Sequence, residues 1–226
     1  MTPAIPVART NYIFIDFENV HETDWARIVG KPVKAKLILG EQNKYIPIAV
    51  VKNLIKCAAQ VELIETKQTG KGAADIVLAD HVGEQSKEDP HGYFHIVSGD
   101  KGFDALISHL KGHGILAARR ASFSDIPVLM HVAERVERLA AFFKNNPLNH
   151  PKKRQSLESQ IQAVFGKALS PEDVAATVQG LVAAKVIELS ATGEVVYRTT
   201  KTSSAPASKT TPSKPPMSSS ARTRTN

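Results

Sequence analysis

The stretch that decides the fold is Tyr12–Val20, YIFIDFENV, in which a short apolar run ends on an aspartate and continues into a polar loop. A run that is rich in β-branched and aromatic residues, and that does not alternate with polar ones, is typical of a strand buried on both faces of a parallel sheet. Open parallel sheets gather their ligands at the carboxyl ends of the strands. We therefore predict a central strand here, with Asp16 in a functional site.

Similar runs recur along residues 11–149 and alternate with longer helical patterns, which is typical of an α/β domain whose mainly parallel sheet is covered by helices on both faces. The predicted strands are 12–16, 36–39, 61–65, 93–97 and 115–118. The predicted helices are 46–59, 73–85, 103–111 and 126–144. In the second of these helices, the three-to-four spacing of Ile76, Ala79 and Val82 predicts the stripe that faces the core.

A second, smaller unit is predicted after this domain, which we assign to residues 1–149. The segment 150–155, HPKKRQ, combines proline with consecutive cations and is interpreted as a linker. Residues 156–198 show two helical patterns followed by a β-hairpin, which predicts a small α+β, winged-helix-like module. Residues 199–226 hold five cations, no acidic residue and mostly Ser, Thr and Pro, so we predict a disordered basic tail.

Composition narrows the class of protein. The chain has 226 residues, 42% of them hydrophobic, which is enough to bury a core in one domain plus a small companion. The single cysteine, Cys57, excludes an internal disulfide. No apolar run reaches the roughly 18 residues that a membrane-spanning helix needs, and the N-terminus lacks the charge order of a signal peptide. We predict a cytoplasmic protein with no membrane association.

The net charge of +7 lies mostly in the tail, since acids and cations nearly balance over residues 1–198. The tail therefore contributes either nonspecific attraction to phosphates or solubility alone. The chain has no G-x-S-x-G, no G-x-x-x-x-G-K-[ST], no G-x-G-x-x-G and no paired Cys/His zinc spacing. Serine hydrolase, P-loop, dinucleotide and zinc sites thus lose their main support.

Carboxylates follow several of the predicted elements. Asp100 comes after the strand 93–97, Asp104 follows one helical turn later, and Asp75 begins the helix 73–85. If they converge with Asp16, their mutual repulsion implies a divalent cation, and hard oxygen ligands select Mg²⁺ or Mn²⁺. Such a site activates water for the hydrolysis of a phosphodiester. Asn19 either binds the metal or orients Asp16, and these two roles are equally compatible with its position.

Three segments, YIFIDFENV (12–20), GKGAADIVLADHV (70–82) and FHIVSGDKGFDALISHL (94–110), together resemble the successive motifs of NYN-type domains of the PIN-like nuclease superfamily. The resemblance spans roughly residues 11–120. It implies a three-layer α/β/α fold and a metal-dependent ribonuclease site. The positions that match the family's site residues are Asp16, Asn19, Asp75 and Asp100.

One position departs from the family pattern. Many NYN sequences carry Ser-Gly-Asp-x-Asp-Phe, whereas Gly102 stands here at the second Asp. Either Asp104 supplies the missing carboxylate from one turn along the helix, or the site is weakened and the domain binds RNA without cutting it. Lys71, in the loop before the middle helix, is either a phosphate contact or a solvated side chain.

These observations favour a metal-dependent endoribonuclease in which Asp16, Asp75, Asp100 and Asp104 hold Mg²⁺ or Mn²⁺. A second hypothesis is a nuclease-like module that binds RNA or a protein without turnover. A third is a phosphohydrolase for small molecules, although the chain lacks the second Asp two residues after the first that haloacid-dehalogenase-like phosphatases require. We predict RNA as the partner, assign substrate or protein recognition to the C-terminal module, and leave a homodimer open.

Overall fold

The structure is a computed structural model and describes residues 9–20, 24–67, 70 and 72–198. Lys71 and the predicted disordered tail 199–226 lie outside the described residues. None of the described helices is both long enough and apolar enough to cross a membrane.

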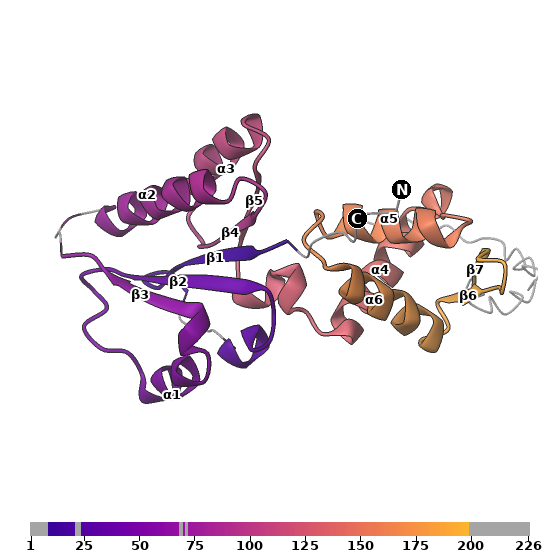
Figure 1. The fold of residues 1–226 in the computed structure, drawn as a ribbon, viewed down its shortest axis with the longest axis horizontal. Helices are drawn as coiled ribbons and strands as arrows, with labels where there is room; N and C mark the ends of the chain where they lie inside the picture. Colours follow the sequence, from indigo (N-terminus) through magenta and orange to yellow (C-terminus); the bar gives the residue numbers. More distant parts are fainter. Residues whose placement is uncertain (1–8, 21–23, 68–69, 71, 199–226) are drawn as a thin grey trace, which may run out of the picture.

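A five-stranded sheet in the order β3-β2-β1-β4-β5 forms the centre of the first domain (Figure 1). All of its neighbouring strands run parallel, and the register places Asp16 beside Ile38. The predicted α/β architecture with a parallel sheet is thereby confirmed. The strands are β1 (Asn11–Asp16), β2 (Val33–Leu39), β3 (Val61–Glu65), β4 (Tyr93–Val97) and β5 (Leu116–Arg120).

The two faces of the sheet bury different cores, because successive side chains of a strand point to opposite sides. Tyr12 and Phe14 of β1 pack beneath two helices on one face, whereas Ile13 and Ile15 pack into the other core. The first face is covered by α2 (Ala73–Glu88) and α3 (Phe103–Gly112), and the second by α1 (Ile48–Lys56) together with the 3-10 turns η1 (Trp25–Ile28), η2 (Ala58–Gln60), η3 (Phe123–Asp125) and η4 (Pro127–Leu129). The result is the expected three-layer α/β/α arrangement.

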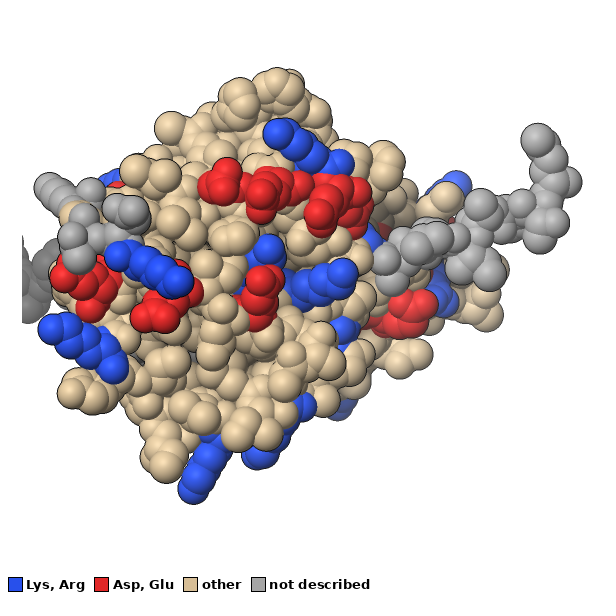
Figure 2. All heavy atoms as spheres, turned by 60° about the vertical axis from the view of Figure 1, so that its left-hand side comes forward, with Lys and Arg blue, Asp and Glu red and all other residues tan. Residues whose placement is uncertain are grey.

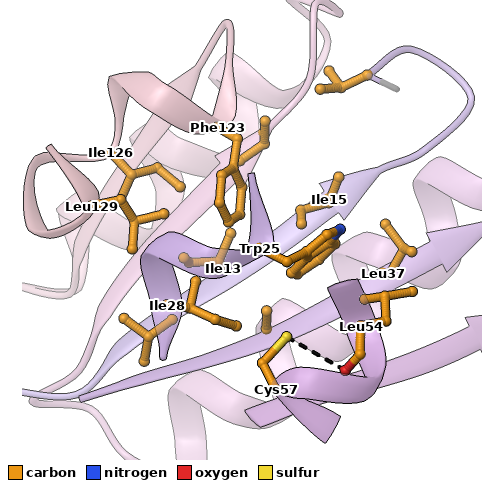
Figure 3. Packing of buried hydrophobic residues seen from close by; sticks show 14 of the residues in the cluster. Ile13, Ile15, Trp25, Ile28, Leu37, Leu54, Cys57, Phe123, Ile126 and Leu129 are labelled. Atoms are coloured by element: carbon orange, nitrogen blue, oxygen red, sulfur yellow. Dashed lines mark hydrogen bonds between the residues drawn. The ribbon is translucent and has the colours of Figure 1, made fainter. Parts of the chain in front are cut away.

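A tryptophan organises the second core. Trp25, from η1, is fully buried, and its ring lies 5.3 Å from that of Phe123 (Figure 3). Ile13 and Ile28 pack in the same cluster, as Figure 3 also shows. The sequence analysis did not predict η1, because four residues are too few to show a helical period.

Helix α2 is rotated relative to the prediction. Its buried residues are Ala74, Leu78, Val82 and Ser86. Of the expected core stripe, Val82 is buried as predicted, but the placement of Ile76 is wrong, since 72% of Ile76 is exposed. The period was read correctly but its phase was not, because helix spacing alone does not say which of two apolar stripes meets the sheet.

The C-terminal unit consists of three helices and a hairpin around their own core. They are α4 (Val132–Asn145), α5 (Arg154–Val164), α6 (Pro171–Ala183), β6 (Ile187–Leu189) and β7 (Val195–Tyr197), with the turn η5 (Pro147–Asn149) after α4. The helices α5 and α6 and the antiparallel hairpin occur where the sequence predicts them. Leu139 and Phe143 of α4 share this core with Leu157 of α5. The hydrophobic clusters thus change near Met130, ahead of the predicted linker 150–155, and α4 packs with the second unit.

This unit lies at the edge of the sheet where the strands begin, away from the edge where they end (Figure 1). Asn11, the first residue of β1, donates from Nδ2 to the carbonyl oxygen of Ala168 at 3.4 Å. Lys31, just before β2, forms an ion pair of 3.3 Å with Asp173, which also accepts from Arg135 of α4 at 2.9 Å. The C-terminal unit therefore leaves the carboxyl edge of the sheet open.

Candidate active site at the carboxyl edge of the sheet

Asp16 is the most deeply placed of the candidate carboxylates, with 2% of the residue exposed at the end of β1. Its Oδ2 accepts hydrogen bonds from Ser98 Oγ at 2.8 Å and from Asn19 Nδ2 at 2.5 Å. Burying a carboxylate is costly unless such donors compensate it. Of the two roles open to Asn19, the structure shows the contact that orients Asp16.

Ser98 links the first strand to the loop after β4. Its hydroxyl donates to Asp16 and accepts from the backbone N–H of Asp100 at 3.0 Å. Asp100 Oδ1 in turn accepts from the backbone N–H of Gly102 at 2.7 Å. Asp100 is exposed, and this hydrogen bond holds its carboxylate against the turn that precedes α3. Sequence reasoning did not single out Ser98, although its place in Ser-Gly-Asp after a buried strand was the available signal.

Asp75 stands in the first turn of α2 and is half-buried. Burial raises the pKa of its carboxyl group, and the negative charges of Asp16, Asp100 and Glu18 raise it further. A helix N-terminus acts in the opposite direction, since it favours a charged carboxylate. Desolvation is the largest cause of the raised pKa, and the three negative charges add to it. No described residue forms an ion pair with any of these four carboxylates.

Glu18 is a member of this acidic group that the predicted set omitted. Its Oε1 accepts from the backbone N–H of Gln42 at 3.4 Å, in the loop after β2. A Cβ atom at Gly40 would lie 2.0 Å from the same oxygen, so only glycine leaves room for the Glu18 side chain. Asn43 ties the two loops together by donating to the carbonyl oxygen of Phe17 at 3.4 Å. In the sequence, the signal for this close approach of Glu18 was Gly40, a glycine directly after a buried strand.

Asp104 is held differently from the others. Arg119 of β5 pairs with it, with 2.7 Å between Nε and Oδ1, and also donates to the carbonyl oxygen of Ser98 at 3.3 Å. The hydrogen bond from Arg119 lowers the pKa of the Asp104 carboxyl group. Asp104 is not among the charges that act on Asp75. In the structure Asp16, Asp75 and Asp100 are close enough to interact electrostatically, and Asn19 contacts Asp16. Asp104 instead forms an ion pair with Arg119.

A cleft of about 410 Å³ lies against this group. Glu18, Gly40 and Asp75 line it, together with Thr66 and residues of the loop before α2. Figure 2 turns the left-hand side of Figure 1, where the strands end, toward the viewer and shows several separate groups of acidic side chains with Lys and Arg among them. The cleft gives a ligand access to Glu18 and Asp75, whereas Asp16 and Asp100 are not among its lining residues.

The donor set has the chemistry of a site for a hard divalent cation, since it consists of carboxylate oxygens that repel one another. Among the residues that the structure describes, no three His, Cys, Asp or Glu side chains are arranged closely enough to hold a metal ion. The carboxylate oxygens are of the kind that hard divalent cations prefer, but the described residues do not form a preformed metal-binding group.

Residues 10–120 match the family model described as a PIN domain. The match covers the whole five-stranded sheet with α1, α2 and α3, and includes every predicted site residue. Over these residues the chain is similar to PIN domains, the superfamily that the three motifs also indicated. PIN domains are generally nucleases and typically use divalent metals. No curated protein and no solved structure matches the chain.

Proposed function

We propose that this protein, whose residues 10–120 are PIN-like, is a metal-dependent endoribonuclease of the NYN type. The observation that supports the proposal most is the raised pKa of Asp75 beside Asp16 and Asp100 at the carboxyl edge of the sheet. These acidic groups remain mutually unfavourable until a cation neutralises them. An RNA phosphodiester, which is itself anionic, approaches them only after that neutralisation.

The chain's own residues divide the work. Asp16, Asp75 and Asp100 would hold Mg²⁺ or Mn²⁺, and such an ion would activate water and offset charge on the phosphodiester. Ser98 and Asn19 position Asp16, because both donate hydrogen bonds to its Oδ2.

Asp104 serves as a further ligand only after Arg119 leaves it, since that arginine now occupies its carboxylate. A substrate phosphate is a suitable alternative partner for the guanidinium group. Substrate binding would then free Asp104 for the metal. In this proposal Asp104 contributes less to metal affinity than Asp16 does.

A second candidate function is a nuclease-like module that binds RNA or a protein without cutting. Two observations favour it, namely Gly102 at the position of the second family aspartate and the pairing of Asp104 with Arg119. This alternative predicts RNA binding without turnover, with the winged-helix-like C-terminal unit as a recognition surface.

Cleavage of an end-labelled single-stranded RNA by the full chain tests the proposal, in Mn²⁺, in Mg²⁺ and in EDTA. Asp16→Asn and Asp100→Asn should each abolish the metal-dependent products, and a DNA strand of the same sequence should be cut more slowly. Asp80→Asn, on an exposed face of α2, is the matched control and should cut normally. Undiminished cleavage by Asp16→Asn would show that the assigned chemistry is wrong, whereas binding without cleavage by the unmodified chain would favour the second function.

A further inference from the structure

A groove of about 470 Å³ lies in the C-terminal unit, outside the acidic site. Its walls come from the last turns of α4, the segment around η5, the end of α6 and the end of β7. The volume lies within the usual range for small-ligand pockets, roughly 300–1,000 Å³. Among its lining residues are Phe143, Lys144, His150, Lys185 and Tyr197.

Three rings form one wall of the groove. His150 is stacked on Tyr197, with 4.1 Å between ring centroids and 20° between ring planes. Phe143 meets both rings edge-on, at 5.7 Å from His150 and 5.1 Å from Tyr197. His150 Nε2 donates to the carbonyl oxygen of Phe143 at 3.0 Å, which fixes the orientation of the imidazole ring. Phe143 is buried beneath the other two rings, so the aromatic surface that the groove offers comes from the partly exposed His150 and Tyr197, and nucleobases stack on rings of this kind.

The charged residues that line the groove are all cations. Lys144 and Lys185 form no ion pair with any described residue, while Arg198 pairs with Glu188. A groove without an acidic lining residue selects an anionic occupant. The chain's own tail, which begins directly after Arg198, has five cations and no acid and is thus the wrong charge to fill it.

Lys185 adopts a backbone conformation that glycine usually takes. Its φ is +56°, and it follows the last turn of α6, where Val186 N–H donates to the carbonyl oxygen of Leu181 at 3.0 Å. Helices commonly end on glycine at such a left-handed position, because a Cβ atom is disfavoured there. The left-handed backbone conformation is unfavourable for lysine, and residues in such conformations cluster at binding sites.

We infer that this groove binds a nucleobase of single-stranded RNA, with the base on the aromatic wall and the adjoining phosphates on Lys144 and Lys185. The inference rests on the proposed function, which makes RNA the substrate. Because the unit lies at the opposite edge of the sheet from the acidic site, RNA bound here is anchored and not cut (Figure 1). The groove lowers KM for a long RNA and leaves a short one unaffected.

Lys185→Gly is the sharpest test, because glycine suits the backbone at this position and only the cation is lost. We measure the affinity of the full chain for a fluorescein-labelled single-stranded RNA by fluorescence anisotropy, in EDTA so that no cleavage intervenes. Loss of one phosphate contact should weaken binding about fivefold near 0.1 M salt and reduce the salt slope by about 0.7. The melting temperature of the variant should not fall.

Lys167→Gly is the matched control. Lys167 also follows a helix with positive φ, at +63°, but it does not line the groove. Its replacement removes the same charge and relieves the same conformation, so RNA affinity should stay within twofold of the unmodified chain. His150→Ala, which removes the imidazole ring, should weaken single-stranded RNA more than an RNA duplex whose bases are already stacked.

Equal RNA affinity for Lys185→Gly and the unmodified chain would overturn the inference, and so would equal weakening by Lys185→Gly and Lys167→Gly. If an acidic amphipathic peptide binds tightly in the groove and RNA does not displace it, the groove belongs to a protein partner instead. The two proposals fail separately. Lys185-dependent RNA binding by a chain that never cuts supports the groove alone, and cleavage with unchanged binding in Lys185→Gly supports the nuclease alone.

Discussion

Replacing Asp75 by asparagine should stabilise the metal-free protein while removing its activity. The carboxylate is half-buried among three other acidic groups, and both effects raise its pKa. Asparagine has nearly the same shape and carries no charge, so it escapes the repulsion and most of the desolvation. Against this stands the lost attraction between the charge and the α2 N-terminus, typically 0.3–1 kcal/mol. We expect the relief from burial and repulsion, which both raise the pKa of Asp75, to exceed this loss.

We expect a net gain of about 1 kcal/mol in the free energy of unfolding at neutral pH, after allowance for solvent screening of a half-buried group. For a chain of this size that corresponds to an increase of about 2–4 °C in melting temperature. The gain should depend on pH in a defined direction. A carboxyl group whose pKa is raised on folding keeps its full stability below the ordinary value of 3.8 and loses it as the pH rises through the folded-state pKa.

Thermal unfolding in EDTA, followed from about pH 3 to pH 7, measures this. The melting temperatures of Asp75→Asn and the unmodified chain should converge at the acid end and separate toward neutrality. Added Mn²⁺ should then stabilise the unmodified chain and not the variant, since only the unmodified chain retains the ligand. Asp80→Asn controls for the loss of any one acid from α2. A variant that is less stable than the unmodified chain in EDTA at pH 7 would refute the reasoning.

Three further substitutions test individual parts of the site. Ser98→Ala should lower the free energy of unfolding by about 2 kcal/mol in chemical denaturation, because it removes a donor from the buried Asp16 carboxylate; a change under about 0.5 kcal/mol would mean that the hydrogen bond is dispensable. Gly40→Ala should displace Glu18 and enlarge KM or reduce kcat for RNA, and crystals of the variant that show an unmoved Glu18 would contradict the close approach. Asp104→Asn should reduce cleavage at saturating Mn²⁺ less than Asp16→Asn, because an arginine already neutralises that carboxylate; equal losses would show that it is a full ligand.

The fold was largely readable from the sequence, since β1 and β4 are mostly apolar and the other strands of the parallel sheet are short segments with apolar residues. The strands 61–65 and 93–97 were predicted to the residue, and the 73–85 helix differs only at its end. The phase of α2 was not readable. Ile76 and Leu78 lie on alternative apolar stripes, and the choice between them depends on how the helix sits over Phe14, which is tertiary information.

The allocation of α4 shows a second limit. Its amphipathic pattern predicts a buried face, and Leu139 and Phe143 are indeed buried. Periodicity does not say which core receives that face, and the proline-rich stretch after the helix suggested a boundary there. Removal of residues 156–226 would consequently expose part of the second core, so the C-terminal unit is best tested by point variants in the full chain.

The sequence predicted which edge of the sheet carries the candidate site, but not all the contacts between its side chains. Strand ends and a helix start predicted that Asp16, Asp75 and Asp100 lie near one another, as their electrostatic interaction shows, whereas their roles in a site stay a prediction. The pairing of Asp104 with Arg119 depends on where β5 lies beside α3, and no sequence spacing encodes that contact.

Binding of Mn²⁺ to the metal-free full chain, followed by the electron paramagnetic resonance of free Mn²⁺, tests the central claim most directly. The acidic group at the carboxyl edge should bind the ion, EDTA should reverse the binding, and Asp16→Asn should abolish it while Asp80→Asn leaves it intact. Absence of Mn²⁺ binding by the unmodified chain, or unchanged binding by Asp16→Asn, would contradict a metal-dependent nuclease at this site.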